Sequence, residues 1–233
     1  AGTHGKTTTS AILGHVLAYC NMPVTAFLGG ITENYKSNFI SKGTEITVVE
    51  ADEFDRSFLT LKPDIACITS MDADHLDIYG DVTAIEESFV EFANLVPNKK
   101  QLLHKKGLPL AGQSVAIAET ADYEAQNVRI KNGVYIFDLK TPGRILSGLE
   151  FSLPGHHNLH NANTALDMAS LAGAPVTSLP KALSTFKGVE RRFTYKIKRD
   201  DLVLIDDYAH HPTEIDALYQ AVTEMYPNDE KLI

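Results

Sequence analysis

One stretch of the sequence restricts the fold more than any other: Ala1-Gly-Thr-His-Gly-Lys-Thr-Thr-Thr-Ser10. The order Gly5-Lys6-Thr7 is typical of a phosphate-binding loop, in which backbone N–H groups surround phosphate oxygens, the lysine adds a positive charge and the hydroxyl ligates Mg²⁺. The helix that follows such a loop adds a partial positive charge at its N-terminus. Since ligand loops of this kind lie at the carboxyl edge of a parallel sheet, the stretch predicts an α/β fold.

The residues after the loop support this interpretation. Apolar side chains recur there at helical spacing, at Ile12, Leu13, Val16, Leu17 and Cys20, and predict an amphipathic helix with one face against a sheet. The motif is incomplete, because its usual first glycine would precede Ala1. The alternative is a glycine turn that caps an ordinary helix, with Lys6 on a solvated face. We expect a nucleoside triphosphate, bound by Gly2, Thr3, His4, Gly5, Lys6, Thr7 and Thr8.

Composition excludes several classes of protein. With 233 residues and 44% hydrophobic content, the chain is long enough for one large domain or for one domain and part of another. A formal net charge of -9 disfavours a nucleic-acid binder, which needs a basic surface. Cys20 and Cys67 lack metal-ligand spacing and are expected to be reduced core thiols. We find no signal peptide and no uninterrupted membrane span, which predicts a cytoplasmic protein without a membrane partner.

Two β-prone runs place polar residues near the loop. Ile46–Val49 and Asp64–Thr69 have the apolar character of strands buried on both faces, as in a parallel sheet. The first run ends at Glu50, and the second leads into a polar segment that contains His75. Since the carboxyl ends of parallel strands share one edge, we expect Glu50 and His75 to meet at the γ-phosphate beside Lys6.

This arrangement predicts a magnesium site. Thr7, Glu50 and His75 are the candidate ligands, although a nitrogen ligand is unusual for so hard a cation. Lys6, Glu50 and His75 are the candidate catalytic residues. The alternative is that the acidic side chains of this region form a solvated rim: Glu50, Asp52, Glu53, Asp55, Asp72, Asp74 and Asp77. Because such a rim would repel a nucleotide unless cations bridged the two, two metal ions are expected.

The remaining pattern predicts a mostly parallel sheet flanked by helices, with an antiparallel hairpin portion. Turn signals between Asn127 and Phe151 indicate the hairpins. Further helices and strands are expected at Val82–Val96, Leu102–Leu103, Ser114–Ile117, from Asn158 to near Gly173, and at Thr177–Phe186. Thr32–Lys42 is polar and is expected to be a surface loop. Within it, Asn38 is a candidate substrate contact; its alternative is an asparagine favoured only by turn chemistry.

Asn158 and Asn161 lie three residues apart at the start of a predicted helix, so their side chains share a face. A carboxamide both donates and accepts, which lets it match the N6/N7 edge of adenine. The alternative for Asn158 is a helix N-cap. Three nearby histidines are weak evidence for a metal: His156, His157 and His160.

The last part of the sequence contains a candidate phosphate or ribose contact. In Lys187–Phe193, an arginine could reach such a group with its fork of donors, and a surface ion pair with Glu190 is the alternative. A buried strand at Leu202–Ile205, the loop Asp206–Pro212 and a helical stripe then follow, as at the start of another α/β domain. The sequence thus appears as a piece that begins and ends inside structural units.

Taken together, the motifs resemble those of the Mur ligases of peptidoglycan synthesis. They are Gly2-Thr-His-Gly-Lys-Thr-Thr8, Glu50-Ala-Asp-Glu53, Asp74-His-Leu-Asp77, His157-Asn-Leu-His-Asn161, Arg191-Arg-Phe193 and Asp206-Asp-Tyr-Ala-His-His-Pro212. The last motif is most similar to the branch that adds L-alanine to UDP-N-acetylmuramate. The resemblance implies ATP and Mg²⁺ as cofactors, an acyl-phosphate intermediate, and a role in cell-wall biogenesis.

The resemblance also implies a domain plan. Residues 1–199 correspond to the central ATP-binding domain, and residues 200–233 to the beginning of a truncated, Rossmann-like C-terminal domain. The N-terminal uridine-nucleotide domain and the rest of the C-terminal domain are then the missing partners of this segment. A piece of this extent is expected to be catalytically silent alone.

The resemblance assigns roles to individual residues. It implies that Lys6 and Thr7 bind phosphate and Mg²⁺, and that Glu50 and His75 ligate a second Mg²⁺. Asn158 and Asn161 would bind adenine, and Arg192 the nucleotide. The loop residues that would approach nucleotide or amino-acid substrate are Asp207, Tyr208, His210 and His211. Either histidine of that loop is a candidate general base by residue type alone.

One position departs from the wider family pattern. Several relatives carry a lysine fifteen residues after the histidine that corresponds to His75, and this sequence has Val90 there. Its absence favours the alanine-adding branch. Other functions stay open at this point: a ligase that recycles a murein tripeptide, a phosphate-loop kinase or simple NTPase, and a nucleotide-binding regulatory module without catalysis.

Overall fold

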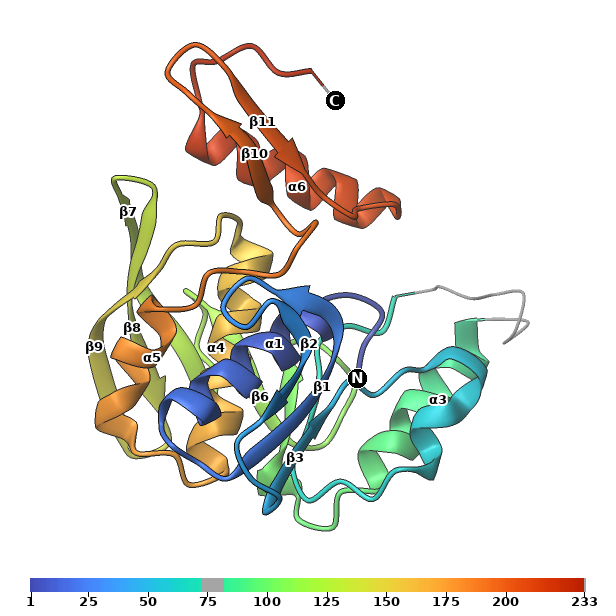
Figure 1. Cartoon of the computed structure of the whole chain (residues 1–233). Helices are drawn as coiled ribbons and strands as arrows, with labels where there is room; N and C mark the ends of the chain where they lie inside the picture. Colours follow the sequence, from blue (N-terminus) through green and yellow to red (C-terminus); the bar gives the residue numbers. More distant parts are fainter. Residues whose placement is uncertain (73–81, 233) are drawn as a thin grey trace.

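The computed structural model describes residues 1–72 and 82–232. Its central feature is a pair of packed helices, α1 (Lys6–Tyr19) and α4 (His156–Leu171), which lie between two sheets. Figure 1 shows α1 behind the small sheet of β1 and β2, with α4 on its other side. The helices and both sheets contribute to one large hydrophobic core.

The small sheet has the order β2-β1-β3, with β1 at Val24–Thr32, β2 at Ser37–Ser41 and β3 at Ile46–Val49. Strands β1 and β3 are parallel, and β1 and β2 are antiparallel. In β3 only Val48 is buried, so the prediction of a strand buried on both faces is wrong. The reason is that β3 is an edge strand of this sheet.

The large sheet runs in sequence order from β4 to β9. Strands β4 to β7 are parallel, and β7 also begins an antiparallel meander that continues with β8 and β9. This confirms the predicted mostly parallel sheet with a hairpin portion. The strands are β4 (Ala66–Ile68), β5 (Leu102–Lys105), β6 (Gln113–Ile117), β7 (Tyr123–Lys131), β8 (Val134–Thr141) and β9 (Arg144–Phe151). All three residues of β4 are buried, as predicted.

Ala1 attaches the phosphate loop to the large sheet. Its amino group donates a hydrogen bond to the Cys67 carbonyl at 2.8 Å, and its carbonyl accepts one from the Thr69 amide at 3.1 Å. The loop therefore starts at the carboxyl end of β4. This is the edge at which the sequence predicts the ligand site.

Helix α1 is not amphipathic, so the prediction of a single buried face is wrong. Every residue from Thr7 to Ala18 is buried, because the small sheet covers one side of the helix and α4 and α5 (Leu179–Ser184) cover the other. Gly14 permits this close packing, since a Cβ there would lie 3.0 Å from the Ala26 Cβ. His15 is buried on the helix as well, between the Tyr35 hydroxyl and the Ala182 carbonyl.

The segment Thr32–Lys42 is not simply a surface loop, because it contains β2. Of the residues in this strand only Ile40 is buried, while Asn38 and Phe39 are exposed. Phe39 lies opposite Phe27 of β1, and their ring centroids are 5.2 Å apart. Pairing with β1 therefore outweighs the polar composition.

The other helical segments connect these layers. Helix α3 (Val82–Asn94) packs on η1 (Phe54–Thr60) and β4, and short 3₁₀ turns occur at η2 (Lys99–Gln101) and η3 (Val176–Ser178). No helix in the described residues is long and apolar enough to cross a membrane.

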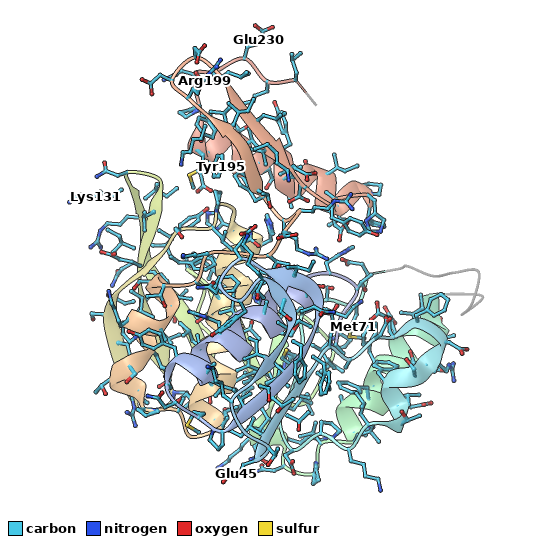
Figure 2. The ribbon with its side chains drawn as sticks, in the orientation of Figure 1. Glu45, Met71, Lys131, Tyr195, Arg199 and Glu230 are labelled. Carbon is cyan, nitrogen blue, oxygen red and sulfur yellow. The ribbon has the colours of Figure 1, made fainter. Side chains whose placement is uncertain are left out.

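The last elements form an upper unit in Figure 1: an antiparallel hairpin of β10 (Thr194–Lys198) and β11 (Val203–Asp206), covered by α6 (Pro212–Met225). Tyr195 and Arg199, both labelled in Figure 2, belong to this hairpin. The hairpin crosses the predicted division after residue 199, and that division stays a prediction.

Candidate functional site

The phosphate loop wraps the start of α1 with two glycines in conformations that other residues rarely adopt. Gly2 has φ +132° and lies so close to β4 that a Cβ would be 2.3 Å from the Thr69 hydroxyl. Gly5 has φ +85° and is the N-cap of α1, and it provides no side-chain cap. The first N–H groups of a helix have no partner within the helix, so those of α1 face an anion-binding position.

Lys6 contacts a carboxylate that the sequence analysis does not assign to the site. Its Nζ donates to both carboxylate oxygens of Glu53, at 2.7 and 2.8 Å. The Glu53 side chain is 3% exposed, whereas Asp52 is 60% exposed and lies 4.0 Å from Nζ. The ammonium group is therefore held at the loop by a buried acidic side chain. Glu53 closes the motif Glu50-Ala-Asp-Glu53, but only its contact with Lys6 in space shows its role.

Thr7 and Glu50 meet as predicted from the sequence order. The Thr7 hydroxyl donates to Glu50 Oε1 at 2.9 Å, and the Gly29 amide donates to Oε2 at 3.0 Å. Gly29 is needed for this contact, because a Cβ there would lie 2.4 Å from Oε2. An Arg192 nitrogen lies 3.3 Å from the same Thr7 hydroxyl. Residues from three distant parts of the chain thus surround the first turn of α1.

The two oxygens of Thr7 and Glu50 fit a hard cation. Neighbouring ligands of an octahedral Mg²⁺ at about 2.1 Å are about 3.0 Å apart, which agrees with the 2.9 Å between these oxygens. In the described part of the chain, no group of three or more His, Cys, Asp or Glu side chains is arranged to hold a metal. His75, together with Asp74 and Asp77, lies outside the described residues. Its predicted role as a ligand stays a prediction.

Asn158 and Asn161 both lie in the first turns of α4, buried against the loop side of the core. Asn158 is the third residue of the helix and not its N-cap, which is Gly155. Its amide nitrogen donates to the Pro154 carbonyl at 2.7 Å. Asn161 packs directly on the phosphate loop, since a Cβ on Gly5 would lie 2.5 Å from its Oδ1. Asn161 therefore adjoins the phosphate loop, Asn158 is held by the backbone of Pro154, and contact of either carboxamide with adenine stays a prediction.

The nearby histidines make separate contacts instead of forming a cluster. His160 Nε2 lies 3.3 Å from the Val115 carbonyl of β6, and burial lowers the pKa of His160 to about 4. His156 Nε2 lies 3.5 Å from Glu224 of α6. These arrangements give no support to a metal site at the start of α4.

Arg192 adjoins the loop that precedes α6. Asp207 accepts hydrogen bonds from the Phe193 amide at 2.7 Å and from the Ala209 amide at 2.8 Å, and so ties this loop to the turn after Arg192. The ring of Tyr208 lies under two guanidinium groups, 5.0 Å from Arg191 and 5.9 Å from Arg192. The alternative pairing of the arginine with Glu190 is not what the structure describes, since Glu190 lies 3.7 Å from Lys36.

His210 and His211 follow Tyr208 at the start of α6. His211 is the N-cap of the helix and takes part in a capping box with Glu214. His210 is exposed, and its Nδ1 lies 3.0 Å from the Tyr208 carbonyl. Glu214 also contacts His4 of the phosphate loop, with 3.2 Å between Oε1 and the imidazole Nδ1. Sequence reasoning overlooks Glu214, although its position three residues after the N-cap is a capping signal.

The structure therefore brings most of the predicted residues to one edge. The loop, Glu50, Asn161 and Arg192 surround the start of α1, and Asp207, Tyr208 and His211 lie next to them through Arg192 and His4. Asn38 is exposed on the edge strand β2, and its proposed substrate contact stays a prediction. These positions form the candidate anion-binding site, between the central body and the upper unit.

Comparisons with known proteins agree with this geometry. Residues 1–169 match the model of the Mur ligase middle domain. A UDP-N-acetylmuramate–L-alanine ligase of Christiangramia forsetii is 62% identical over 232 residues, which are 100% of this chain and 51% of that protein. The chain thus spans about half the length of the curated relatives that it matches.

Solved structures show the same fold. A UDP-N-acetylmuramate–alanine ligase from Thermotoga maritima superimposes with a TM-score of 0.82 at 27% identity, over 98% of this chain and 54% of that one. A MurF ligase from the same organism, solved in complex with ADP, gives a TM-score of 0.74 at 20% identity, over 95% of this chain and 55% of that one. Given the match to the middle-domain model over residues 1–169, the chain belongs to the Mur ligase family.

Proposed function

We propose that this chain is the nucleotide-binding part of an ATP-dependent ligase that joins L-alanine to UDP-N-acetylmuramate. In this proposal residues 1–199 are the central domain and residues 200–233 begin the C-terminal domain. One observation carries it: Thr7, Glu50 and Arg192 meet at the first turn of α1, where a bound triphosphate would end. The 62% identity to an enzyme of that name supports the choice of substrates.

The proposed reaction has two steps. The muramyl carboxylate oxygen attacks the γ-phosphorus of ATP, and the bond between this phosphorus and the oxygen that bridges to the β-phosphate breaks. ADP departs, and the product is an acyl phosphate. The alanine amine then attacks the acyl carbon, loses a proton, and inorganic phosphate leaves with the electron pair of the broken C–O bond. The net change converts ATP, a carboxylate and an amine into ADP, inorganic phosphate and an amide, and the carboxylate supplies the oxygen that leaves with the phosphate.

The main barrier that the chain's residues must lower is repulsion between anions. Two unit charges about 4 Å apart repel by about 4 kcal/mol at an effective dielectric near 20. Arg192 supplies positive charge beside the Thr7 hydroxyl, Lys6 supplies it from the loop, where Glu53 holds its ammonium group, and the first N–H groups of α1 point at the phosphate position. Arg192 and Lys6 are each held by a side-chain contact before the nucleotide binds.

We further propose that Thr7 and Glu50 hold Mg²⁺, with His75 as an additional ligand. When bound, the cation neutralises phosphate charge and orients the transferred group. Glu50 is fixed for this purpose by the Gly29 amide, which leaves its Oε1 directed at the Thr7 hydroxyl. Asn158 and Asn161 would hold the adenine ring and Tyr208, His210 and His211 would approach the substrates.

Phosphate release by the full-length protein tests this function. With ATP, Mg²⁺ and UDP-N-acetylmuramate present, we expect release to depend on L-alanine and to be much slower with glycine, L-serine or a murein tripeptide. Release without any amino acid would instead identify an NTPase, and tripeptide-dependent release a recycling ligase. Retention of intact ATP under all conditions would favour a regulatory module. The chain alone should bind ATP without turnover, and Lys6→Met should abolish that binding.

A further inference from the structure

His4 has a side chain whose contacts phosphate binding does not explain. Its backbone is fixed on the end of β4, because its amide donates to the Ser70 hydroxyl at 2.8 Å and its carbonyl accepts from the Thr69 hydroxyl. The imidazole is 17% exposed and lies between two carboxylates: Nδ1 is 3.2 Å from Glu214 Oε1, and Nε2 is 3.2 Å from Asp72 Oδ2. The loop is thus connected to α6, 210 residues along the chain.

Glu214 transmits this contact to the loop before α6. While its Oε1 contacts His4, its Oε2 accepts hydrogen bonds from the His210 amide at 3.2 Å and the His211 amide at 3.4 Å. The hydrogen bond from His4, which has the largest effect, and the two backbone hydrogen bonds lower the pKa of Glu214 to about 2. A single charged carboxylate therefore holds one side chain of the phosphate loop and two backbone groups of the substrate loop.

The rings add a second connection between the same two loops. The centroids of His4 and His211 are 5.0 Å apart, and the rings are tilted by 44°. At its other end the loop is tied to the arginine turn by Asp207. Residues 207–211 are therefore fixed at both ends by groups that adjoin the phosphate position.

We infer that His4 is a positioning residue that couples the phosphate loop, through Glu214, to the loop Asp207–His211. This inference rests on the proposed binding of ATP by the phosphate loop. A nucleotide that orders the phosphate loop then also orders residues 207–211, and ligands of that loop strengthen nucleotide binding by the same factor. His4 itself needs no contact with the nucleotide for this effect.

Hydrogen exchange of the chain with and without ATP and Mg²⁺ tests the coupling. In the wild type, ATP should slow exchange of the His210, His211 and Thr213 amides by about fivefold or more. In His4→Phe, which keeps a ring against His211 but removes both nitrogens, this slowing should be lost at ATP concentrations that saturate the variant. His4→Ala should behave in the same way. The coupling is wrong if either variant binds ATP and keeps the full slowing.

His156→Ala is the matched control. It removes a histidine contact to Glu224, which lies in α6 like Glu214 but at the end of the helix far from the loop. This variant should keep the ATP-dependent slowing of exchange. If the slowing were lost in His156→Ala as well, any weakening of α6 would abolish it, and a specific role of His4 would be contradicted. Calorimetric ATP binding is measured first for every variant. A wild-type chain that binds no ATP would contradict the proposed function itself, whereas binding without slower exchange would contradict only the role of His4.

The full-length ligase offers a second measurement that a purely structural role would not affect. Loss of the His4 contact should raise KM for L-alanine at saturating ATP and KM for ATP at saturating L-alanine by similar factors, about tenfold each, since a hydrogen bond to a charged group is lost and the coupling it carried is reciprocal. A rise in one constant without the other would contradict the proposed path through Glu214.

Discussion

The hydroxyl oxygen of Thr7 lies 2.9 Å from Oε1 of Glu50, although the two residues are 43 positions apart in the sequence. This contact joins the phosphate loop on the large sheet to the end of β3 on the small sheet. It places two oxygens about as far apart as neighbouring ligands of an octahedral Mg²⁺. The proposed catalytic centre depends on this relationship.

Gly5→Ala should damage the site through its backbone and its neighbour at once. A residue with a Cβ is strained at φ +85°, and the added carbon would lie 2.5 Å from Asn161 Oδ1. We expect ATP affinity to fall at least about tenfold, measured by calorimetry. Gly133→Ala is the control, because Gly133 also has positive φ, +73°, but nothing lies within 4 Å of the added carbon. Equal ATP affinities for the two variants would contradict this prediction.

Glu53→Ala should destabilise the fold more than Asp52→Ala. The first change removes a buried carboxylate that holds Lys6 with two hydrogen bonds, and breaking such a pair costs about 2–4 kcal/mol where one partner keeps some exposure. Asp52 is 60% exposed and 4.0 Å from Nζ, so its removal should cost less than about 1 kcal/mol. Urea unfolding of both variants compares these free energies. A smaller loss for Glu53→Ala would mean that the pair does not stabilise the loop.

Parts of this site could be predicted from sequence because their signal is local. Lys6 and Thr7 belong to one short motif, and Glu50 directly follows a β-prone run. The edge rule for a single parallel sheet does not explain why Glu50 meets the loop, because β3 belongs to the small sheet and the loop is attached to the large one. The contacts of Lys6 with Glu53 and of His4 with Glu214 span 47 and 210 residues. They depend on side-chain direction and on how the upper unit is placed, and neither follows from motif spacing.

The wrong predictions about the fold have a similar origin. The apolar stripe of α1 was a correct feature of the sequence but did not reveal that α4 and α5 cover the opposite face. Small residues of the helix, such as Ser10 and Gly14, which faces Ala26 of β1, are buried by close packing and not by hydrophobicity. In β2, pairing with β1 outweighs a polar composition. Tertiary packing decided each of these cases.

Asp167→Asn should stabilise the protein increasingly as pH rises. Asp167 is fully buried in α4, both of its carboxylate oxygens are without a hydrogen-bond partner in the described residues, and burial raises its pKa well above 3.8. The folded state therefore binds a proton that the unfolded state releases above pH 3.8, so the wild type loses stability as pH rises toward the raised folded pKa. An asparagine side chain has no proton that titrates in this range, so the variant lacks this pH-dependent loss of stability.

The difference in unfolding free energy between Asp167→Asn and the wild type is the quantity to measure. Between pH 5 and the folded pKa it should grow by about 1.4 kcal/mol per pH unit, because one proton is involved. Urea unfolding at several pH values determines it, and the shared contributions of other groups cancel in the difference. A difference that is independent of pH would show that Asp167 is ionised in the fold.

Calorimetric titration of ATP with and without Mg²⁺ tests most directly whether Thr7 and Glu50 hold Mg²⁺ beside the phosphates. We predict that Mg²⁺ tightens ATP binding to the wild-type chain by at least about tenfold, that Glu50→Gln removes most of this gain, and that Asp55→Asn, an exposed change in the same acidic stretch, keeps it. Full retention of the Mg²⁺ effect in Glu50→Gln would contradict the account.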